Sequence, residues 1–212
     1  LGSRDGILKA KCEMFDYAAD DVKAFVNGDD DKLITLKDIA RTFGMDPSRD
    51  VWADSMEKLG FDGIRCRIHT DAEASFEAVI PLPGTHMVYN AMAGTCIGLA
   101  LGLSIDEIRA GIESLKPLPG RSNILHTEHY TLLDDCYNAN PASMMESLNV
   151  LDDTHSRKVA ILGDMGELRP QSDALHASVG EHLKNLHVDI LVTIGTLSAA
   201  LFSIYMNRKD QK

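Results

Sequence analysis

Polar residues crowd the segment Leu133–Pro141, which reads Leu-Asp-Asp-Cys-Tyr-Asn-Ala-Asn-Pro. An apolar strand is expected just before it, at 130–133, and the proline is placed to begin a helix. Open α/β sheets bind ligands at the carboxyl ends of their strands. Asp135 could accept hydrogen bonds from a ribose, whereas Asn138 and Asn140 offer donors and acceptors to a peptide or a sugar. A turn rich in Asn and Asp, without a ligand, is the alternative interpretation.

A second segment of the same kind, Ile161–Leu168, reads Ile-Leu-Gly-Asp-Met-Gly-Glu-Leu. Two polar segments that each follow an apolar strand favour a ligand site over an isolated turn. His176 comes shortly after, near helical spacing with Val179 and Gly180, which fits a packing histidine at least as well as a ligand. The other histidines show no metal-ligand spacing.

Periodicity in the second half of the chain predicts the elements that must hold these segments. Strands alternate with helices, a pattern that implies a parallel, Rossmann-like sheet. The expected strands are 124–126, 130–133, 159–162 and 188–194, and the expected helices are 141–151, 172–186 and 197–206.

The first half mixes helices with paired strands. We expect strands at 24–27, 64–69 and 75–80, the last two as an antiparallel hairpin, and helices at 3–18, 36–43, 87–101 and 104–115, the last opened by a capping box at Ser104. Two prolines and a glycine in Lys116–Arg121 predict a stiff linker. The predicted domains are therefore residues 1–118 and 119–212.

The composition predicts a folded, cytoplasmic protein. The chain of 212 residues is 44% hydrophobic and 25% charged, enough to bury roughly 70% of its unfolded surface. A net charge of −11 argues against general binding to nucleic acid or membrane surfaces, and there is neither a long apolar run nor a signal-peptide pattern. The four cysteines lack metal-site or disulfide spacing, so we expect reduced and mainly buried thiols at Cys12, Cys66, Cys96 and Cys136.

Six segments in order resemble the Mur ligases, and within them the branch that adds D-alanyl-D-alanine to UDP-N-acetylmuramoyl tripeptide. They are the two polar segments described above together with Leu1–Lys11, Asn27–Asp30, Gly84–Ala91 and Pro119–Arg121. The resemblance implies an α/β fold: the remainder of a central ATPase domain, followed by a Rossmann-like C-terminal domain. The Gly-x-x-x-x-Gly-Lys-Ser/Thr phosphate loop is absent. We therefore expect this chain to be an internal piece of the enzyme that is inactive alone. The complete protein is expected to be an active monomer.

The chemistry that the resemblance implies is amide-bond formation driven by ATP and Mg²⁺ through an acyl phosphate. Such a reaction needs charge neutralisation and alignment. Lys11 matches the lysine that is carbamylated in this family and then holds magnesium; a lysine that merely extends from an amphipathic helix is the alternative. The nucleotide would be bound by Asn27, His86, Asn90, Arg121 and Asp135, of which Arg121 would grip a phosphate and Asp135 the ribose. The family commonly has Asn where this chain has Met87.

The peptide substrates would be contacted by the residues that characterise the branch: Tyr137, Asn138, Asn140, Asp164, Met165 and Glu167. Two other functions stay open at this point. A non-catalytic module that binds a nucleotide or a partner would also lack the phosphate loop. A ligase of the folylpolyglutamate synthetase type would share the architecture, although the Tyr-Asn-Ala-Asn-Pro segment disfavours it.

Overall fold

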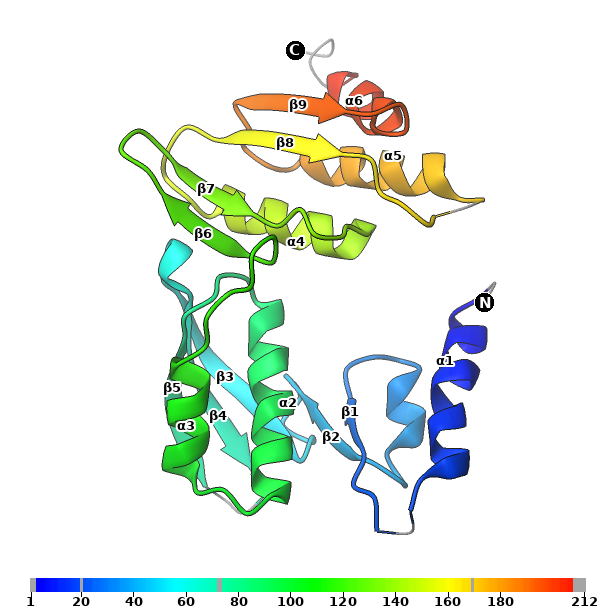
Figure 1. Cartoon of the computed structure of the whole chain (residues 1–212), viewed down its shortest axis with the longest axis vertical. Coiled ribbons are helices and arrows are strands. Elements are labelled where there is room, and N and C mark those ends of the chain that lie inside the picture. Colours follow the sequence, from blue (N-terminus) through cyan, green and yellow to red (C-terminus); the bar gives the residue numbers. More distant parts are fainter. Residues whose placement is uncertain (1–2, 20, 72–73, 169, 208–212) are drawn as a thin grey trace. The chain divides into compact units, whose positions relative to one another are not determined.

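The computed structural model describes residues 3–19, 21–71, 74–168 and 170–207 (Figure 1). The chain forms two compact units. The first comprises Leu1–Lys58, Ile64–Pro81 and Thr85–Leu115, and the second comprises Leu59–Gly63, Leu82–Gly84 and Lys116–Lys212. The second unit's long segment thus begins at Lys116, the first residue of the predicted linker.

A five-stranded sheet organises the first unit, in the order β1-β2-β3-β4-β5. The strands β1 (Phe25–Asn27), β2 (Arg41–Gly44) and β3 (Val51–Lys58) pair in parallel, whereas β3, β4 (Ile64–Thr70) and β5 (Ser75–Ile80) pair antiparallel. The expected hairpin of the last two strands is confirmed.

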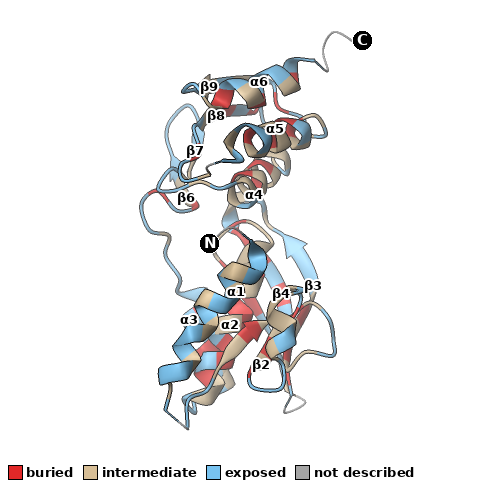
Figure 2. Ribbon diagram, turned by 90° about the vertical axis from the view of Figure 1, so that its right-hand side faces the viewer, coloured by how far each residue is buried: buried red, intermediate tan, exposed pale blue. Residues whose placement is uncertain are grey.

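Two helices complete this unit, α2 (His86–Ala100) and α3 (Ile105–Glu113). Buried residues gather on α2 and on the strands that it lies against (Figure 2). The predicted capping box is present, because Ser104 accepts from Glu107 N–H while Glu107 accepts from Ser104 N–H at 2.8 Å. Among the described residues, no helix is long and apolar enough to cross a membrane.

The predicted helix at 36–43 is wrong. A short 3₁₀ helix, Leu33–Leu36, precedes strand β2 instead. The strand is fixed by Asp50, whose carboxylate accepts from Thr42 N and Thr42 Oγ1, both at 2.7 Å. Such a tertiary contact overrides local helical periodicity. Strand β3 was not predicted, because residues 55–58 are all exposed and lack alternating burial.

The N-terminal helix is shorter than the predicted 3–18. Helix α1 covers Arg4–Cys12 and a 3₁₀ helix follows at Glu13–Tyr17. No residue of α1 is buried, so its apolar stripe does not join the core of this chain. Ion pairs join its first turn to the acidic turn after β1: Arg4 to Asp30 at 3.0 Å and Lys32 to Asp5 at 2.6 Å.

The second unit contains two strand pairs and three helices. Strands β6 (Asn123–His126) and β7 (Thr131–Asp134) form an antiparallel hairpin, and β8 (Val159–Gly163) and β9 (Ile190–Ile194) pair in parallel. The helices are α4 (Pro141–Asp152), α5 (Ser172–Leu183) and α6 (Ser198–Met206). The parallel arrangement expected for all four strands thus holds for β8–β9, whereas the short turn after β6 only permits an antiparallel return.

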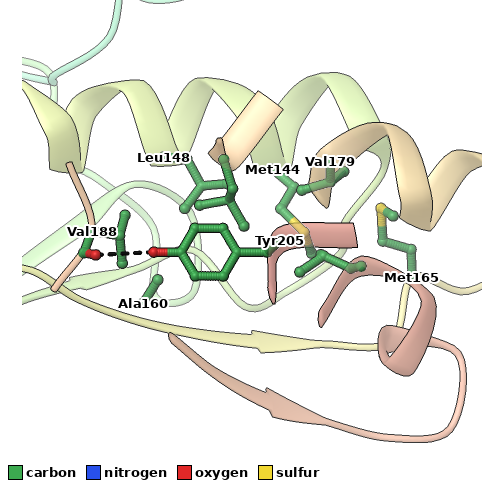
Figure 3. Close-up of a cluster of buried hydrophobic side chains, with 9 residues drawn as sticks. Met144, Leu148, Ala160, Met165, Val179, Val188 and Tyr205 are labelled. Carbon is green, nitrogen blue, oxygen red and sulfur yellow. Dashed lines mark hydrogen bonds between the residues drawn. The ribbon is translucent and has the colours of Figure 1, made fainter. Parts of the chain in front are cut away.

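One face of the β8–β9 pair carries the core of this unit. Leu148 from α4, Leu183 from α5 and Leu201 from α6 pack with Ala160. Tyr205 completes the cluster and donates from its hydroxyl to the Val188 carbonyl at 3.1 Å (Figure 3). Side chains on the opposite face stay at least partly exposed and are apolar: Val159, Ile161, Ile190, Val192 and Ile194. The described residues therefore cover this pair on one side only.

A buried lysine ties the amino ends of β8 and β9 to the end of α4. Lys158 is 8% exposed and donates from Nζ to the Asp152 carbonyl at 2.5 Å and to its Oδ1 at 3.2 Å. Asp152 Oδ1 also accepts from His187 N at 2.7 Å. Burial alone raises the pKa of Asp152, but the hydrogen bonds from His187 and Lys158 outweigh it, so this pKa lies below its ordinary value of 3.8.

We expect Asp152→Asn to lower the free energy of unfolding by about 1.5–3 kcal/mol at pH 7, because it removes a charged acceptor from a buried ammonium. A depressed folded-state pKa contributes stability above the unfolded value, and this stability is lost as the pH falls through the folded value. Urea unfolding from pH 7 to pH 3 should therefore show the difference shrinking below about pH 4. The exposed Asp173→Asn is the control. A constant difference across this range would contradict the assignment.

Candidate functional site

A cavity of about 590 Å³ lies in the second unit. The open edges of β7 and β8 bound its apolar body, and α4 contributes Leu148 and Leu151. Its lining also includes the polar residues that follow the two strands, among them the predicted residues Asp135, Tyr137, Asn138 and Asp164. The two polar segments noted in the sequence therefore meet at one cavity.

Both carboxylate oxygens of Asp135 take part in internal hydrogen bonds. Oδ1 accepts from Ser122 N at 2.9 Å, and Oδ2 accepts from Ser147 Oγ. Neither serine was predicted as part of the site, because they lie 13 and 12 residues away along the chain. Asp135 is consequently held in place before any ligand arrives.

The preceding carboxylate anchors the same turn. Asp134 Oδ2 accepts from Gly120 N at 3.0 Å, and the Gly120 carbonyl accepts from Tyr137 N at 3.0 Å. The pKa of Asp134 lies below its ordinary value, chiefly because the Cys136 thiol donates to it.

Cys136 is exposed, which corrects the expectation that all four thiols are mainly buried. Burial raises the pKa of Cys66 to about 11 and that of Cys96 to about 12.

Arg121 lies in this anchored turn, and its guanidinium carbon sits 4.2 Å from the centre of the Tyr137 ring. Both side chains are exposed. Arg121, which is predicted to bind phosphate, and Tyr137, which is predicted to bind substrate, therefore contact each other. The residues on either side of Arg121 belong to the second unit and are bonded to Asp134 and Asp135, so they do not form a separate linker.

Asn140 begins α4. Its Oδ1 accepts from Ser143 N at 3.0 Å, and Ser143 Oγ accepts from Asn140 N at 3.1 Å. This reciprocal cap, with Pro141 as the first helical residue, fixes the end of the polar loop. The side-chain nitrogen of Asn140, Nδ2, can still donate to a ligand. Asn138 is exposed and lines the cavity.

Asp164 follows β8 and is hydrogen-bonded to the start of α6, which follows β9. Its Oδ1 accepts from Ser198 N at 2.7 Å and from the Ser198 hydroxyl, at the start of α6. The pKa of Asp164 is lowered, chiefly by the hydroxyl bond. Gly195, at φ +113°, packs so closely that a Cβ there would come within 2.3 Å of the carboxylate. Only glycine fits this position, and neither Gly195 nor Ser198 was predicted as part of the site.

Met165 and His176 are structural partners. The Met165 side chain is 1% exposed and joins the core, so it faces no substrate in this chain. Its backbone N–H donates to His176 Nε2 at 2.9 Å, while His176 Nδ1 lies 2.8 Å from the Ser172 carbonyl. These partners assign the proton to Nδ1 and agree with a packing histidine.

Glu167 follows in an uncommon conformation. It is exposed and has φ +61°, which costs a residue with a side chain about 1 kcal/mol or more. Such strain persists only where the neighbouring structure imposes it, and the adjacent Met165–His176 bond is one such constraint. The carboxylate of Glu167 is thereby presented to solvent beside the polar loop.

The nucleotide residues predicted in the first unit lie around β1 and α2. Asn27 ends β1, and its Oδ1 accepts from Asp29 N at 3.0 Å. Asp29 Oδ2 accepts from Tyr89 Oη at 3.0 Å and from Met45 N at 2.6 Å, so one carboxylate joins β1, β2 and α2. His86 begins α2, and the exposed Asn90 lies on the same helix.

Lys11 is exposed in the last turn of α1. Among the described residues, no three His, Cys, Asp or Glu side chains lie together as a metal-binding group. The described residues thus do not by themselves form a magnesium site. Asn90 Nδ2 contacts Met87 Sδ at 3.4 Å, at the position where the chain departs from the family pattern.

Two domain families match this sequence with little of it left over. "Mur ligase middle domain" covers residues 1–98, and "Mur ligase, glutamate ligase domain" covers residues 120–206. The chain belongs to the Mur ligase family. The α/β architecture expected from the resemblance is confirmed by this membership and by the strands and helices described above.

Curated and solved relatives agree with this assignment. The UDP-N-acetylmuramoyl-tripeptide–D-alanyl-D-alanine ligase of Escherichia coli (strain K12) is 33% identical over 212 residues, covering 95% of this chain and 46% of the relative. A crystal structure of MurF from Acinetobacter baumannii matches with a TM-score of 0.88 and 32% identity, covering 96% of this chain and 45% of that one. The chain therefore spans about half the length of these relatives.

More distant structures share the fold. MurF ligase from Thermotoga maritima, solved in complex with ADP, has a TM-score of 0.82 at 23% identity, covering 94% of this chain and 47% of that one. A folylpolyglutamate synthase from Thermotoga maritima has a TM-score of 0.59 at 16% identity, covering 99% of this chain and 59% of that one. These two likenesses concern the fold alone.

We expect His176→Leu to lower the free energy of unfolding of the second unit by about 1–3 kcal/mol, because it leaves the Met165 N–H without its acceptor. Amide exchange at Met165 should accelerate with it. Denaturant unfolding and hydrogen exchange measure the two effects, with the exposed His155→Leu as a control expected to change stability by less than about 0.5 kcal/mol. Unchanged exchange at Met165 would contradict the role assigned to His176.

Proposed function

We propose that this chain is part of an ATP-dependent ligase that adds D-alanyl-D-alanine to UDP-N-acetylmuramoyl tripeptide. The observation that carries the proposal is that the two polar loops, residues 134–140 and 164–167, flank one cavity in a chain whose full-length relatives have this activity. In the complete protein we place it in the cytoplasm, acting as a monomer without nucleic acid or membrane insertion.

The proposed reaction has two steps. The tripeptide carboxylate attacks the γ-phosphorus of ATP, which forms an acyl phosphate and releases ADP. The amine of D-alanyl-D-alanine then attacks the acyl carbon, and phosphate leaves from the tetrahedral intermediate while the amine loses a proton. Magnesium, when bound, would neutralise phosphate charge. Neither step requires a nucleophile from the protein, so the protein would act mainly by positioning the reacting groups.

Arg121 is the residue of the second unit that we assign to phosphate. A guanidinium presents paired N–H groups that match two phosphate oxygens, and the anchored turn keeps its backbone in place. Asp135 is assigned to the ribose. A carboxylate accepts about four hydrogen bonds, so the two internal bonds described above leave room for ribose hydroxyls.

The peptide ends are assigned to the polar loops. The side-chain amides of Asn138 and Asn140 offer donors to a peptide carboxylate, and the carboxylates of Asp164 and Glu167 suit an incoming ammonium group. Met165 would act here only by fixing the backbone of its loop, since its side chain is buried. Asn27, His86 and Asn90 remain assigned to adenine by the family register.

Lys11 is proposed as the carbamylated lysine on the same basis. Reaction of its amine with carbon dioxide gives a carbamate and a proton, which converts a cation into an anion able to bind magnesium. The residues described around it do not enclose it. Support for this role therefore comes from the family register rather than from the surroundings of Lys11.

A non-catalytic nucleotide-binding module is the second candidate. The observation in its favour is that this sequence lacks a phosphate loop, whose backbone N–H groups would hold the β- and γ-phosphates. A folylpolyglutamate-type ligase is a weaker alternative, because the shared fold is its only support. Substrate requirements separate these functions.

We expect the complete protein that contains this sequence to form the D-alanyl-D-alanine adduct when given ATP, magnesium and UDP-N-acetylmuramoyl tripeptide. The chain of 212 residues alone should give no detectable product, since it has no phosphate loop. Mass spectrometry of the product and an assay of phosphate release test both expectations. Glutamate with a folate acceptor is the control reaction; its turnover in place of the muramoyl peptide would contradict the proposal.

In the complete protein, Lys11→Ala should lower kcat by about 10²-fold or more if its carbamate organises the phosphate charge. Millimolar short carboxylic acids should then restore part of the rate by supplying an anion. Lys9→Ala, on the same exposed helix, is the matched control. Near-normal turnover of Lys11→Ala at saturating magnesium would remove this residue from the catalytic machinery.

A further inference from the structure

The turn that carries Arg121 is unusually constrained. Arg121 N donates to the Leu118 carbonyl at 3.0 Å, closing a turn with Pro119 and Gly120 at its centre. Gly120 has φ +73° and Ser122, which is 7% exposed, has φ +46°. Pro-Gly suits a turn that needs a positive φ at its third residue, whereas the serine holds a conformation that side chains disfavour.

Three hydrogen bonds hold this turn against the loop after β7. They join Gly120 N to Asp134, Ser122 N to Asp135 and Tyr137 N to the Gly120 carbonyl. The backbone positions of Arg121 and Tyr137 are therefore fixed relative to each other. Their side chains meet as a cation over a ring face, at 4.2 Å.

We propose that Tyr137 is a positioning residue for Arg121, rather than a residue that contacts the peptide. The inference rests on the proposed function, because it assigns the held guanidinium to the phosphate of the nucleotide. The ring attracts the guanidinium through its negative face and leaves the N–H edges pointing outward. Arg121 then loses less side-chain freedom when it grips a phosphate.

Two observations set this role apart from simple packing. Tyr137 is 68% exposed, so its ring does not fill a core. The tyrosine N–H, not its side chain, makes the bond to Gly120. Removing the ring should accordingly free Arg121 while leaving the turn intact.

The first experiment uses the chain itself and does not depend on activity. In NMR spectra, ring-current shifts should displace the Arg121 δ-methylene protons upfield. Tyr137→Leu should abolish the displacement and Tyr137→Phe should preserve it, with the amide shifts of Gly120 and Ser122 unchanged in both variants. Random-coil shifts for Arg121 in the unaltered chain would overturn the proposal.

The second experiment uses the complete protein. Tyr137→Leu should raise the KM for ATP about 2- to 5-fold, the size expected of an exposed cation–π contact, with the KM for D-alanyl-D-alanine unchanged. Tyr137→Phe should restore the ATP value, since it keeps the ring and removes only the hydroxyl. In an Arg121→Ala background, Tyr137→Leu should have no further effect on ATP.

Two outcomes would overturn the inference: a rise in the dipeptide KM alone, which would return Tyr137 to substrate binding, or full additivity with Arg121→Ala. Failure of the proposed function is distinguishable. If the unaltered complete protein uses ATP with another acceptor, the proposed function is wrong, but the ATP comparison among these variants still tests the role of Tyr137.

Discussion

Carboxylates that accept backbone N–H groups fix both polar loops of the second unit. Asp134 and Asp135 hold the Gly120–Ser122 turn, and Asp164 holds the start of α6. Charge-assisted bonds of this kind are shorter and stronger than neutral ones, and each joins segments far apart in the chain. The exposed side chains that we assign to ligands depend on these bonds, because loops without them would sample many orientations.

The same residues therefore have two roles. Asp135 is assigned to the ribose, but it also holds Ser122 and Ser147, so its replacement would disturb the turn as well as the ligand contact. Asn140 likewise caps the start of α4, while its side-chain amide is assigned to substrate. Loss of activity after changing either residue will not by itself identify a ligand contact. Asn138, which is exposed and lines the cavity, separates the two effects better.

Local signals in the sequence were sufficient for much of the fold. The Asn140–Pro141 helix start, the Ser104 capping box and the β4–β5 hairpin depend on residues close together in the chain, and all three are present. Strand β2 was mistaken for a helix because its determinant, the bond from Thr42 to Asp50, is a tertiary contact. The expected amphipathic helix at 3–18 is shorter in the structure, and no residue of α1 is buried in this chain.

For the candidate site, motif positions identified the two loops that meet at the cavity but not the residues that support them. Ser122, Ser147 and Ser198 lie too far from their aspartate partners for any spacing rule. Met165 was predicted to contact a peptide substrate, but its side chain is buried. The Pro119–Gly120 pair was interpreted as part of a stiff linker between the two domains. In the structure, it forms a tight turn that presents Arg121.

Amide hydrogen exchange of Gly120 and Ser122 in this chain tests most directly whether the carboxylates fix that turn. Both amides should be protected, and Asp134→Asn should selectively accelerate Gly120 whereas Asp135→Asn selectively accelerates Ser122, with Asp173→Asn changing neither. Exchange of both amides at the rate of an unstructured linker in the unaltered chain would contradict the account.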